Sequence, residues 1–251
     1  MKFAPRAIID DGFITIMLEV YRIVLERKTT ELEHGSRYGN SAGVQPVISR
    51  LTPILNGVND GRTGLDYEKT RLRILPFTRF SALDYGDQFW LIGQTNPVTI
   101  TAAETDHNTH KPFTIDYRLG PYKVCVPMTT FNRHGIDDVH FVPLKNPLAY
   151  NRHPHHHANL HTQGDYPDKI WLDHIVHPLQ DKPGTCWGNY GSLLAALVAD
   201  GDIPELFRQF YVYLTRYNAG SPLIHPRGEQ SRSLHGIQCV DFDYTQEWKE
   251  K

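Results

Sequence analysis

Apolar residues between Phe13 and Val24 recur at spacings of three and four, the period of one face of a helix. Asp10 and Asp11 directly precede this stretch and are candidate N-caps, because a carboxylate can accept hydrogen bonds from the first backbone N–H groups of a helix. The charged residues that follow extend the predicted helix to Gly35, a residue type common at helix ends. The pattern therefore predicts one amphipathic helix near the start of the chain.

Residues 36–70 mix glycine, asparagine, serine and proline around one short apolar stretch, residues 44–55. This composition favours a connector that carries at most one further short helix.

The pattern changes between Leu72 and Val142 to short runs rich in β-branched and aromatic residues, separated by turn-forming residues. These runs predict an antiparallel meander with strands at residues 89–93, 98–102, 113–117, 122–128 and 139–142. Residues 145–168 have almost no apolar periodicity and predict a long loop, which in compact domains is often functional. A short extended run at residues 169–176 follows.

Two helices are predicted near the end of the chain. The first covers residues 190–199 and ends at Gly201. Its expected apolar face is Leu193, Leu194, Leu197 and Val198. The second begins after Asp202 as a cap, with Pro204 in its first turn. Its expected buried residues are Ile203, Leu206, Phe207, Phe210, Tyr211 and Leu214.

These elements predict an α+β fold, an antiparallel β-meander followed by C-terminal helices. We expect three parts: an N-terminal helical extension and connector (1–70), an α+β domain (71–226) and a polar C-terminal tail (227–251). With 40% hydrophobic residues, the 251-residue chain can build an ordinary core.

Charge and composition narrow the class of protein. The 26 basic and 28 acidic residues are scattered, so the chain lacks the basic stripe that nucleic acid binding requires. No signal peptide is visible and no run is apolar enough to cross a membrane, so no membrane partner and a cytoplasmic location are expected. The three cysteines are widely separated, which argues against a disulfide framework.

Cys186 is the candidate nucleophile. It follows a His177-Pro178 turn by nine residues and a small Gly184-Thr185 pair. The helix predicted to begin at Tyr190 could supply backbone N–H groups, which would stabilise a thiolate or an oxyanion. The alternative is that Cys186 is a small buried residue at a strand end, as most lone cysteines are. Trp187 is expected to be a packing residue, and Cys125 an inward or neutral strand residue.

Histidines form the second candidate site, since seven of the fourteen fall between His153 and His177. Imidazole suits zinc, which needs three or four ligands. His153, His155 and His157 are the candidate metal ligands, and Cys186 is a further candidate beside the first two. The alternative is a solvated polar loop, because adjacent loop histidines cannot all point the same way.

The order of elements from about residue 72 to 226 resembles the ubiquitin-conjugating enzyme superfamily, with bacterial or phage relatives included. His177-Pro178 and Cys186 match the family's His-Pro turn and its cysteine, and residues 217–223 resemble its Asn-Pro-x-x-Pro-Leu linker. The resemblance implies that Cys186 carries a ubiquitin-like modifier as a thioester, with an activating enzyme as partner and no required cofactor.

Two alignments of the His-Pro turn remain open. In the first, Leu179 stands where the family has the asparagine that supports the oxyanion, and Asn189 would supply that support. In the second, residues 153–155 form the turn, and His155 replaces the asparagine. In both, the sequence departs from the family by lacking a predicted helix directly before the strands.

Three hypotheses follow for the function. The chain is a ubiquitin-conjugating-like transferase that uses Cys186, or a non-catalytic interaction module of a bacterial or phage assembly, with the assembly's subunits as partners. The third hypothesis is a His-rich metal-binding protein.

Overall fold

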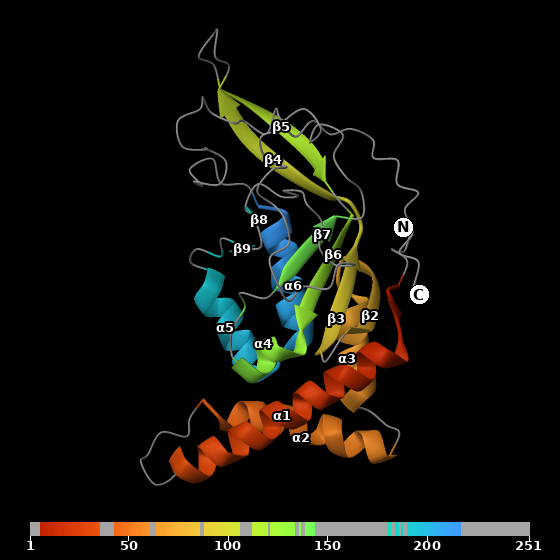
Figure 1. The fold of residues 1–251 in the computed structure, drawn as a ribbon, viewed down its shortest axis with the longest axis vertical. Coiled ribbons are helices and arrows are strands. Elements are labelled where there is room, and N and C mark those ends of the chain that lie inside the picture. Colours follow the sequence, from red (N-terminus) through yellow and green to blue (C-terminus); the bar gives the residue numbers. More distant parts are fainter. Residues whose placement is uncertain are drawn as a thin grey trace. The chain divides into compact units, whose positions relative to one another are not determined.

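The computed structural model describes residues 6–35, 43–60, 64–85, 88–105, 112–119, 121–133, 136, 139–143, 180–181, 184–185, 187 and 190–216. The helices are α1 (Asp11–Gly35), α2 (Gln45–Asp60), α3 (Gly64–Arg73), α4 (Met128–Arg133), α5 (Tyr190–Asp200) and α6 (Ile203–Leu214). The strands are β1 (Ile8–Ile9), β2 (Phe77–Tyr85), β3 (Gln88–Thr95), β4 (Val98–Thr105), β5 (Pro112–Leu119), β6 (Tyr122–Pro127), β7 (His140–Pro143), β8 (Gln180–Asp181) and β9 (Gly184–Thr185). The predicted α+β class is confirmed (Figure 1).

The largest sheet is mixed and has the strand order β1-β2-β3-β6-β7. β1 pairs parallel to β2, whereas β6 and β7 are antiparallel. β4 and β5 form a separate antiparallel ribbon, as do β8 and β9. Pro97 and Pro121 flank the ribbon where it leaves β3 and β6, and proline interrupts a ladder because it has no N–H to donate.

The chain forms two compact units. The first contains residues 1–93, 126–138 and 189–209, and the second contains residues 94–125, 139–188 and 210–251. β3, β6 and α6 each contribute residues to both units.

The core of the first unit is built around α1, which lies alongside α2 (Figure 1). Asp10 caps α1, since its carboxylate accepts a hydrogen bond from the Phe13 N–H at 2.7 Å. All six apolar residues of the predicted face are buried: Phe13, Ile16, Met17, Val20, Tyr21 and Val24. The sequence therefore determined which face of α1 packs inward.

An aromatic cluster joins α1, β2 and α6 in this unit. The Phe207 ring centroid lies 5.9 Å from that of Phe13, 5.6 Å from Phe77 and 5.4 Å from Phe80. A Cβ on Gly93 would come within 2.8 Å of Phe207 and Phe77, so β3 can pass the cluster only with glycine there. Burial of several aromatic rings at these distances contributes strongly to the stability of the unit.

The core of the second unit contains another aromatic cluster. The ring of Phe141 on β7 stacks on Tyr213 of α6 at 5.6 Å, and Phe210 lies 5.8 Å away. At the base of the β4-β5 ribbon, the Tyr122 N–H donates to the Thr95 hydroxyl at 3.0 Å. This bond satisfies a buried backbone donor at the start of β6.

The predicted strands correspond to β3, β4, β5, β6 and β7, and the predicted helices to α1, α5 and α6. On α6 the predicted Tyr211 is half-buried and Tyr213 is buried instead, while the other five predicted residues are buried. On α5 only Leu194 and Val198 of the predicted face are buried, and Leu193 is exposed. The loop and extended run predicted at residues 145–176 lie outside the described residues.

Two predictions about the region before the strands are wrong. Residues 36–70 carry two helices, α2 and the start of α3. Val47, Leu51 and Ile54 form the buried face of α2, and the Glu68 carboxylate is buried on α3. A helix also directly precedes the strands, since only residues 74–76 separate α3 from β2. The strand β2 was not predicted either. The domain limit predicted at residue 70 falls within α3, and the limit at 226 lies outside the described residues, so these limits stay predictions.

We predict that Gly201→Ala will lower the free energy of unfolding by at least about 1–2 kcal/mol, the usual cost of a left-handed conformation for a residue with a Cβ. Gly201 has a φ of +61° between α5 and α6, and a Cβ there would lie 3.0 Å from a Val24 methyl. Urea denaturation measures the change. Gly43→Ala is the matched control, because a Cβ at Gly43 has no atom within 4 Å. An equal effect of the two substitutions would contradict the prediction.

Candidate functional site

The residues predicted from the sequence to carry chemistry all lie outside the described residues. They are Cys186, His177, Asn189, His155, His153 and His157. The structure therefore gives no geometry that joins them, and each remains a prediction.

The described neighbours of Cys186 are Thr185, the last residue of β9, and Trp187. Thr185 pairs with Gln180 of β8. Trp187 is buried, with its ring 5.0 Å from Tyr213 and 5.8 Å from both Phe141 and Phe210. The prediction that Trp187 is a packing residue is confirmed, so the chain is anchored in a hydrophobic cluster one residue after Cys186.

Cys125, the cysteine that lies within the described residues, is not a nucleophile. It lies on β6, where its register partner on β7 is His140, and it is fully buried. Burial raises the pKa of its thiol to about 12, although the charge of Lys123 acts in the opposite direction. Because the thiolate is the reactive form, this cysteine is inert at neutral pH. Its prediction as an inward strand residue is confirmed.

No group of three or more histidine, cysteine, aspartate or glutamate side chains in the described ranges could hold a metal ion. The predicted zinc ligands fall outside those ranges and stay predictions.

The most concentrated buried charge in the described structure is a network of four residues from α1, α3 and the start of α6, all in the first unit. The Tyr21 hydroxyl donates to the Glu68 carboxylate, which is completely buried. Arg71 donates to Glu68 at 2.8 Å and to Asp202 at 2.7 Å. We call Tyr21, Glu68, Arg71 and Asp202 the buried charge network.

Electrostatics in this network favour a fixed protonation state. Burial and the neighbouring charge of Glu68 raise the pKa of the Tyr21 hydroxyl well above its ordinary value, so the phenol stays protonated and donates. Burial lowers the pKa of Arg71, but Glu68 and Asp202 outweigh it and the pKa is raised overall. The arginine therefore stays charged between two carboxylates.

The network is better suited to holding helices together than to catalysis. Each polar group that it buries is occupied by another member, and Asp202 also caps α6 by accepting the Glu205 N–H at 3.2 Å. Sequence reasoning missed this network because it treated residues 36–70 as a connector. The available signal was the spacing of three residues between Glu68 and Arg71, which places the pair on one face of a helix.

Basic side chains of α1 and α2 bind the end of α5 in the same unit. Arg27 donates to the Ala199 carbonyl and, at 3.1 Å, to the Phe131 carbonyl of α4, while Arg50 donates to the Asp200 carbonyl. Lys28 lies 3.6 Å from the Asp200 carboxylate. Cations at carbonyl ends of helices satisfy otherwise unpaired acceptors and interact favourably with the helix dipole. We call residues 199–202 the α5–α6 corner.

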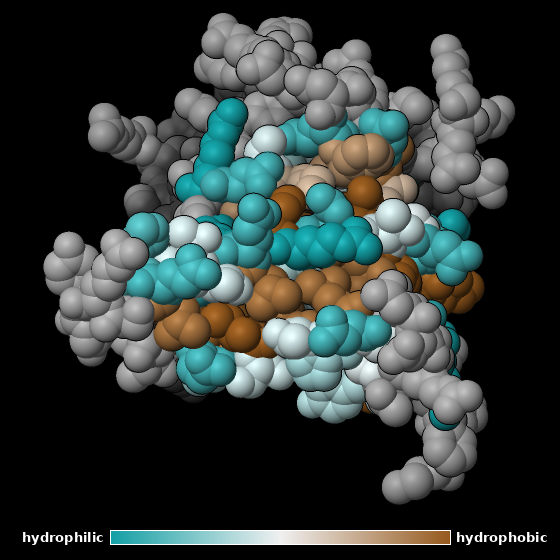
Figure 2. All heavy atoms as spheres, turned by 90° about the horizontal axis from the view of Figure 1, so that it is seen from below, coloured by the Kyte–Doolittle hydropathy of each residue, from teal (hydrophilic) through white to brown (hydrophobic). Residues whose placement is uncertain are grey.

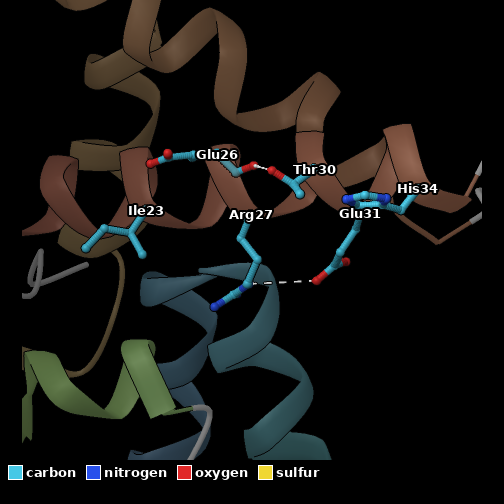
Figure 3. Close-up of a pocket in the computed structure, with 6 residues that line it drawn as sticks. All are labelled: Ile23, Glu26, Arg27, Thr30, Glu31 and His34. Carbon is cyan, nitrogen blue, oxygen red and sulfur yellow. Dashed lines mark hydrogen bonds and ion pairs between the residues drawn. The ribbon is translucent and has the colours of Figure 1, made fainter.

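A surface depression of about 610 Å³ lies along α1 and is lined by Ile23, Glu26, Arg27, Thr30, Glu31 and His34 (Figure 3). Glu31 is 3.9 Å from the Arg27 guanidinium, which also donates hydrogen bonds to carbonyls near the ends of α4 and α5. Burial lowers the pKa of Arg27, and Glu31 and Asp200 oppose that effect. All lining residues belong to one helix, and the acidic and basic groups neutralise each other, so the depression has no catalytic arrangement.

Figure 2 views the molecule of Figure 1 from below, the side on which α1 and α2 lie, and shows a band of hydrophobic residues flanked by hydrophilic ones. The band fits the packing of α1 against α2, since both helices have half-buried apolar side chains beside their buried ones, such as Leu25 and Leu55.

Comparisons with family models, curated proteins and solved structures gave no match to this chain. None of the described helices is long and apolar enough to span a bilayer.

We predict that Arg71→Met will lower the free energy of unfolding by about 3–5 kcal/mol, because it leaves the buried Glu68 carboxylate without its cation. Arg208→Met is the matched control. Arg208 and Glu205 form a pair with the same three-residue spacing, but their side chains are 49% and 28% exposed. Loss of such a surface pair usually costs about 1 kcal/mol or less. Chemical denaturation measures the free energy of unfolding of both variants. Similar losses for Arg71→Met and Arg208→Met would refute the prediction.

Tyr21 also predicts a pH dependence. The unfolded chain releases the phenolic proton near about pH 10, whereas the folded protein retains it, so the contribution of Tyr21 is present below that pH and declines above it. The stability difference between wild type and Tyr21→Phe should therefore narrow as pH rises above about 10. Urea titrations across this range measure it. Tyr67→Phe, at a tyrosine that is 62% exposed, serves as control, and an unchanged difference for Tyr21→Phe would contradict the assignment.

Proposed function

We propose that this chain is a divergent ubiquitin-conjugating-like protein that carries a ubiquitin-like modifier as a thioester on Cys186. The observation that carries the proposal is the order of the described elements. A helix, α3, directly precedes the strands; the sheet follows; and β9 and α5 flank the segment that contains Cys186. The ubiquitin-conjugating enzyme superfamily, which the sequence resembles, has its elements in the same order. It also has a helix directly before the strands, which was not predicted from this sequence.

The two described features nearest the cysteine in sequence support a nucleophilic role. Trp187 is buried in an aromatic cluster, which would restrain the backbone immediately after the thiol. Tyr190, four residues after Cys186 in the sequence, begins α5, and the positive end of a helix dipole favours a thiolate or an oxyanion. Cys125 is excluded as the nucleophile by its burial and by its raised pKa. Cys186 and Cys239 are the remaining cysteines.

The proposed chemistry has two acyl transfers. The Cys186 thiolate attacks the thioester carbonyl of a modifier held on an activating enzyme. A new sulfur–carbon bond forms, the old one breaks, and the activating enzyme's cysteine leaves as a thiolate. An amine then attacks the new thioester, an amide forms, the amine loses a proton, and Cys186 leaves as thiolate. His177 or His155, according to the alignment, would shape the turn, and Asn189 would donate to the oxyanion. The proposed setting is the cytoplasm, where thiols stay reduced.

The test is alkylation of the folded protein with iodoacetamide, followed by peptide mapping of all three cysteines. We predict that Cys186 reacts fastest, that Cys239 reacts as an ordinary thiol, and that Cys125 reacts only after unfolding. Cys186→Ser should remove the fast reaction alone. A Cys186 that reacts no faster than Cys239 would favour the non-catalytic module of a bacterial or phage assembly. Zinc detected by native mass spectrometry, and lost in a triple alanine variant of His153, His155 and His157, would favour the metal-binding protein.

The same reaction distinguishes the two alignments. If His177 forms the turn, His177→Ala should shift the pH at which Cys186 alkylation is half-maximal, and His155→Ala should not. The opposite pattern would support the turn at residues 153–155. Asn189→Ala should leave the alkylation profile unchanged in either case, because an oxyanion donor acts only when an acyl group is present.

A further inference from the structure

The ribbon formed by β4 and β5 has one apolar and one polar face by register. The pairs Val98–Leu119, Ile100–Tyr117 and Ala102–Ile115 alternate with the pairs Thr99–Arg118 and Thr101–Asp116. Directly opposed residues of an antiparallel pair share a face, and successive residues alternate between faces. The register therefore collects aliphatic and aromatic residues on one face along most of the ribbon.

A ribbon of this kind is incomplete by itself. An isolated two-stranded sheet is at best marginally stable in water, and a third or fourth strand normally supports it. Within the part of the chain that the structure describes, β4 and β5 pair only with each other. Among the described strands, the outer edges of β4 and β5 have no ladder partner, and an edge of this kind can pair with another strand.

The sequence of β5 is complementary to itself around Tyr117. If two copies of β5 pair antiparallel across a two-fold axis at Tyr117, Asp116 lies opposite Arg118 of the partner subunit, and the reverse pair forms by symmetry. Ile115 then lies opposite Leu119 of the partner subunit. Opposite charges and apolar pairs in these positions stabilise a sheet. β4 offers no such complement, because its only charged residue is Glu104.

From this complementarity we propose that two copies of the chain associate through the outer edge of β5 about a two-fold axis at Tyr117. The two ribbons then form one four-stranded antiparallel sheet whose apolar residues are continuous across the axis. The occupant of the edge is a second copy, since a single strand supplies both charges of the pair in the required order. This inference does not depend on the proposed chemistry of Cys186.

The test is the solution mass of the full chain by size-exclusion chromatography with light scattering. Wild type should have twice the mass of one chain, and Asp116→Arg should be monomeric, because two arginines then oppose each other at both symmetric positions. The double variant Asp116→Arg/Arg118→Asp should recover the dimer, because the exchanged charges pair again across the axis. Within its own ribbon each exchanged residue still faces a neutral threonine, Thr101 or Thr99, so only the intermolecular pairs change sign.

A second measurement keeps the proposal testable if Asp116→Arg fails to fold. Tyr117→Cys places two cysteines opposite each other at about 4.5–5.5 Å between Cα atoms, within the range that a disulfide bridges. Under mild oxidation this variant should form a disulfide-linked dimer, whereas wild type and the β4 control Thr101→Cys should not. A monomeric wild type, a dimeric Asp116→Arg, an unrescued double variant or an unlinked Tyr117→Cys would each overturn the proposal.

Discussion

The first unit depends on contacts between arginine side chains of α1–α3 and the α5–α6 corner. Arg27 and Arg50 donate to carbonyls at the end of α5, and Arg71 pairs with Asp202 at the start of α6. Between these contacts the chain reverses at Gly201, in a left-handed conformation against Val24. Carbonyls and N–H groups at two adjacent helix ends need partners, and here side chains from α1, α2 and Asp202 itself provide them.

The same contacts explain why a carboxylate can be completely buried. Glu68 would be costly without a cation, but Arg71 lies between it and Asp202, and Tyr21 donates a further hydrogen bond. Removing Arg71 leaves the buried Glu68 carboxylate without its cation. This dependence makes α1–α3 an integral part of the first unit, together with β2 and the α5–α6 corner.

Trp187 links the proposed function to the core of the second unit. Trp187 packs in the cluster of Phe141, Phe210 and Tyr213, directly after the proposed nucleophile. A nucleophile must be held in position, and a buried large side chain next to it restrains the backbone that carries it. Cys125 illustrates the opposite environment: a strand residue whose burial keeps the thiol protonated.

The sequence by itself determined the elements with strong local signals. The apolar period of α1, its Asp10 cap, the helix ends at Gly201 and Asp202 and the alternation in β3 to β7 were all readable, because each depends on neighbours a few residues apart. For the candidate site, the sequence identified Cys186 and the histidines by their chemistry but not their positions in space. Tertiary structure alone decided that Glu68 is buried beside a half-buried Arg71, that residues 45–60 and 64–73 are helical and that Ile8 and Ile9 join β2. The reason is physical: a buried ion pair and a parallel strand pair are stabilised by partners distant in sequence, Tyr21 and Asp202 in one case and residues 79–80 in the other.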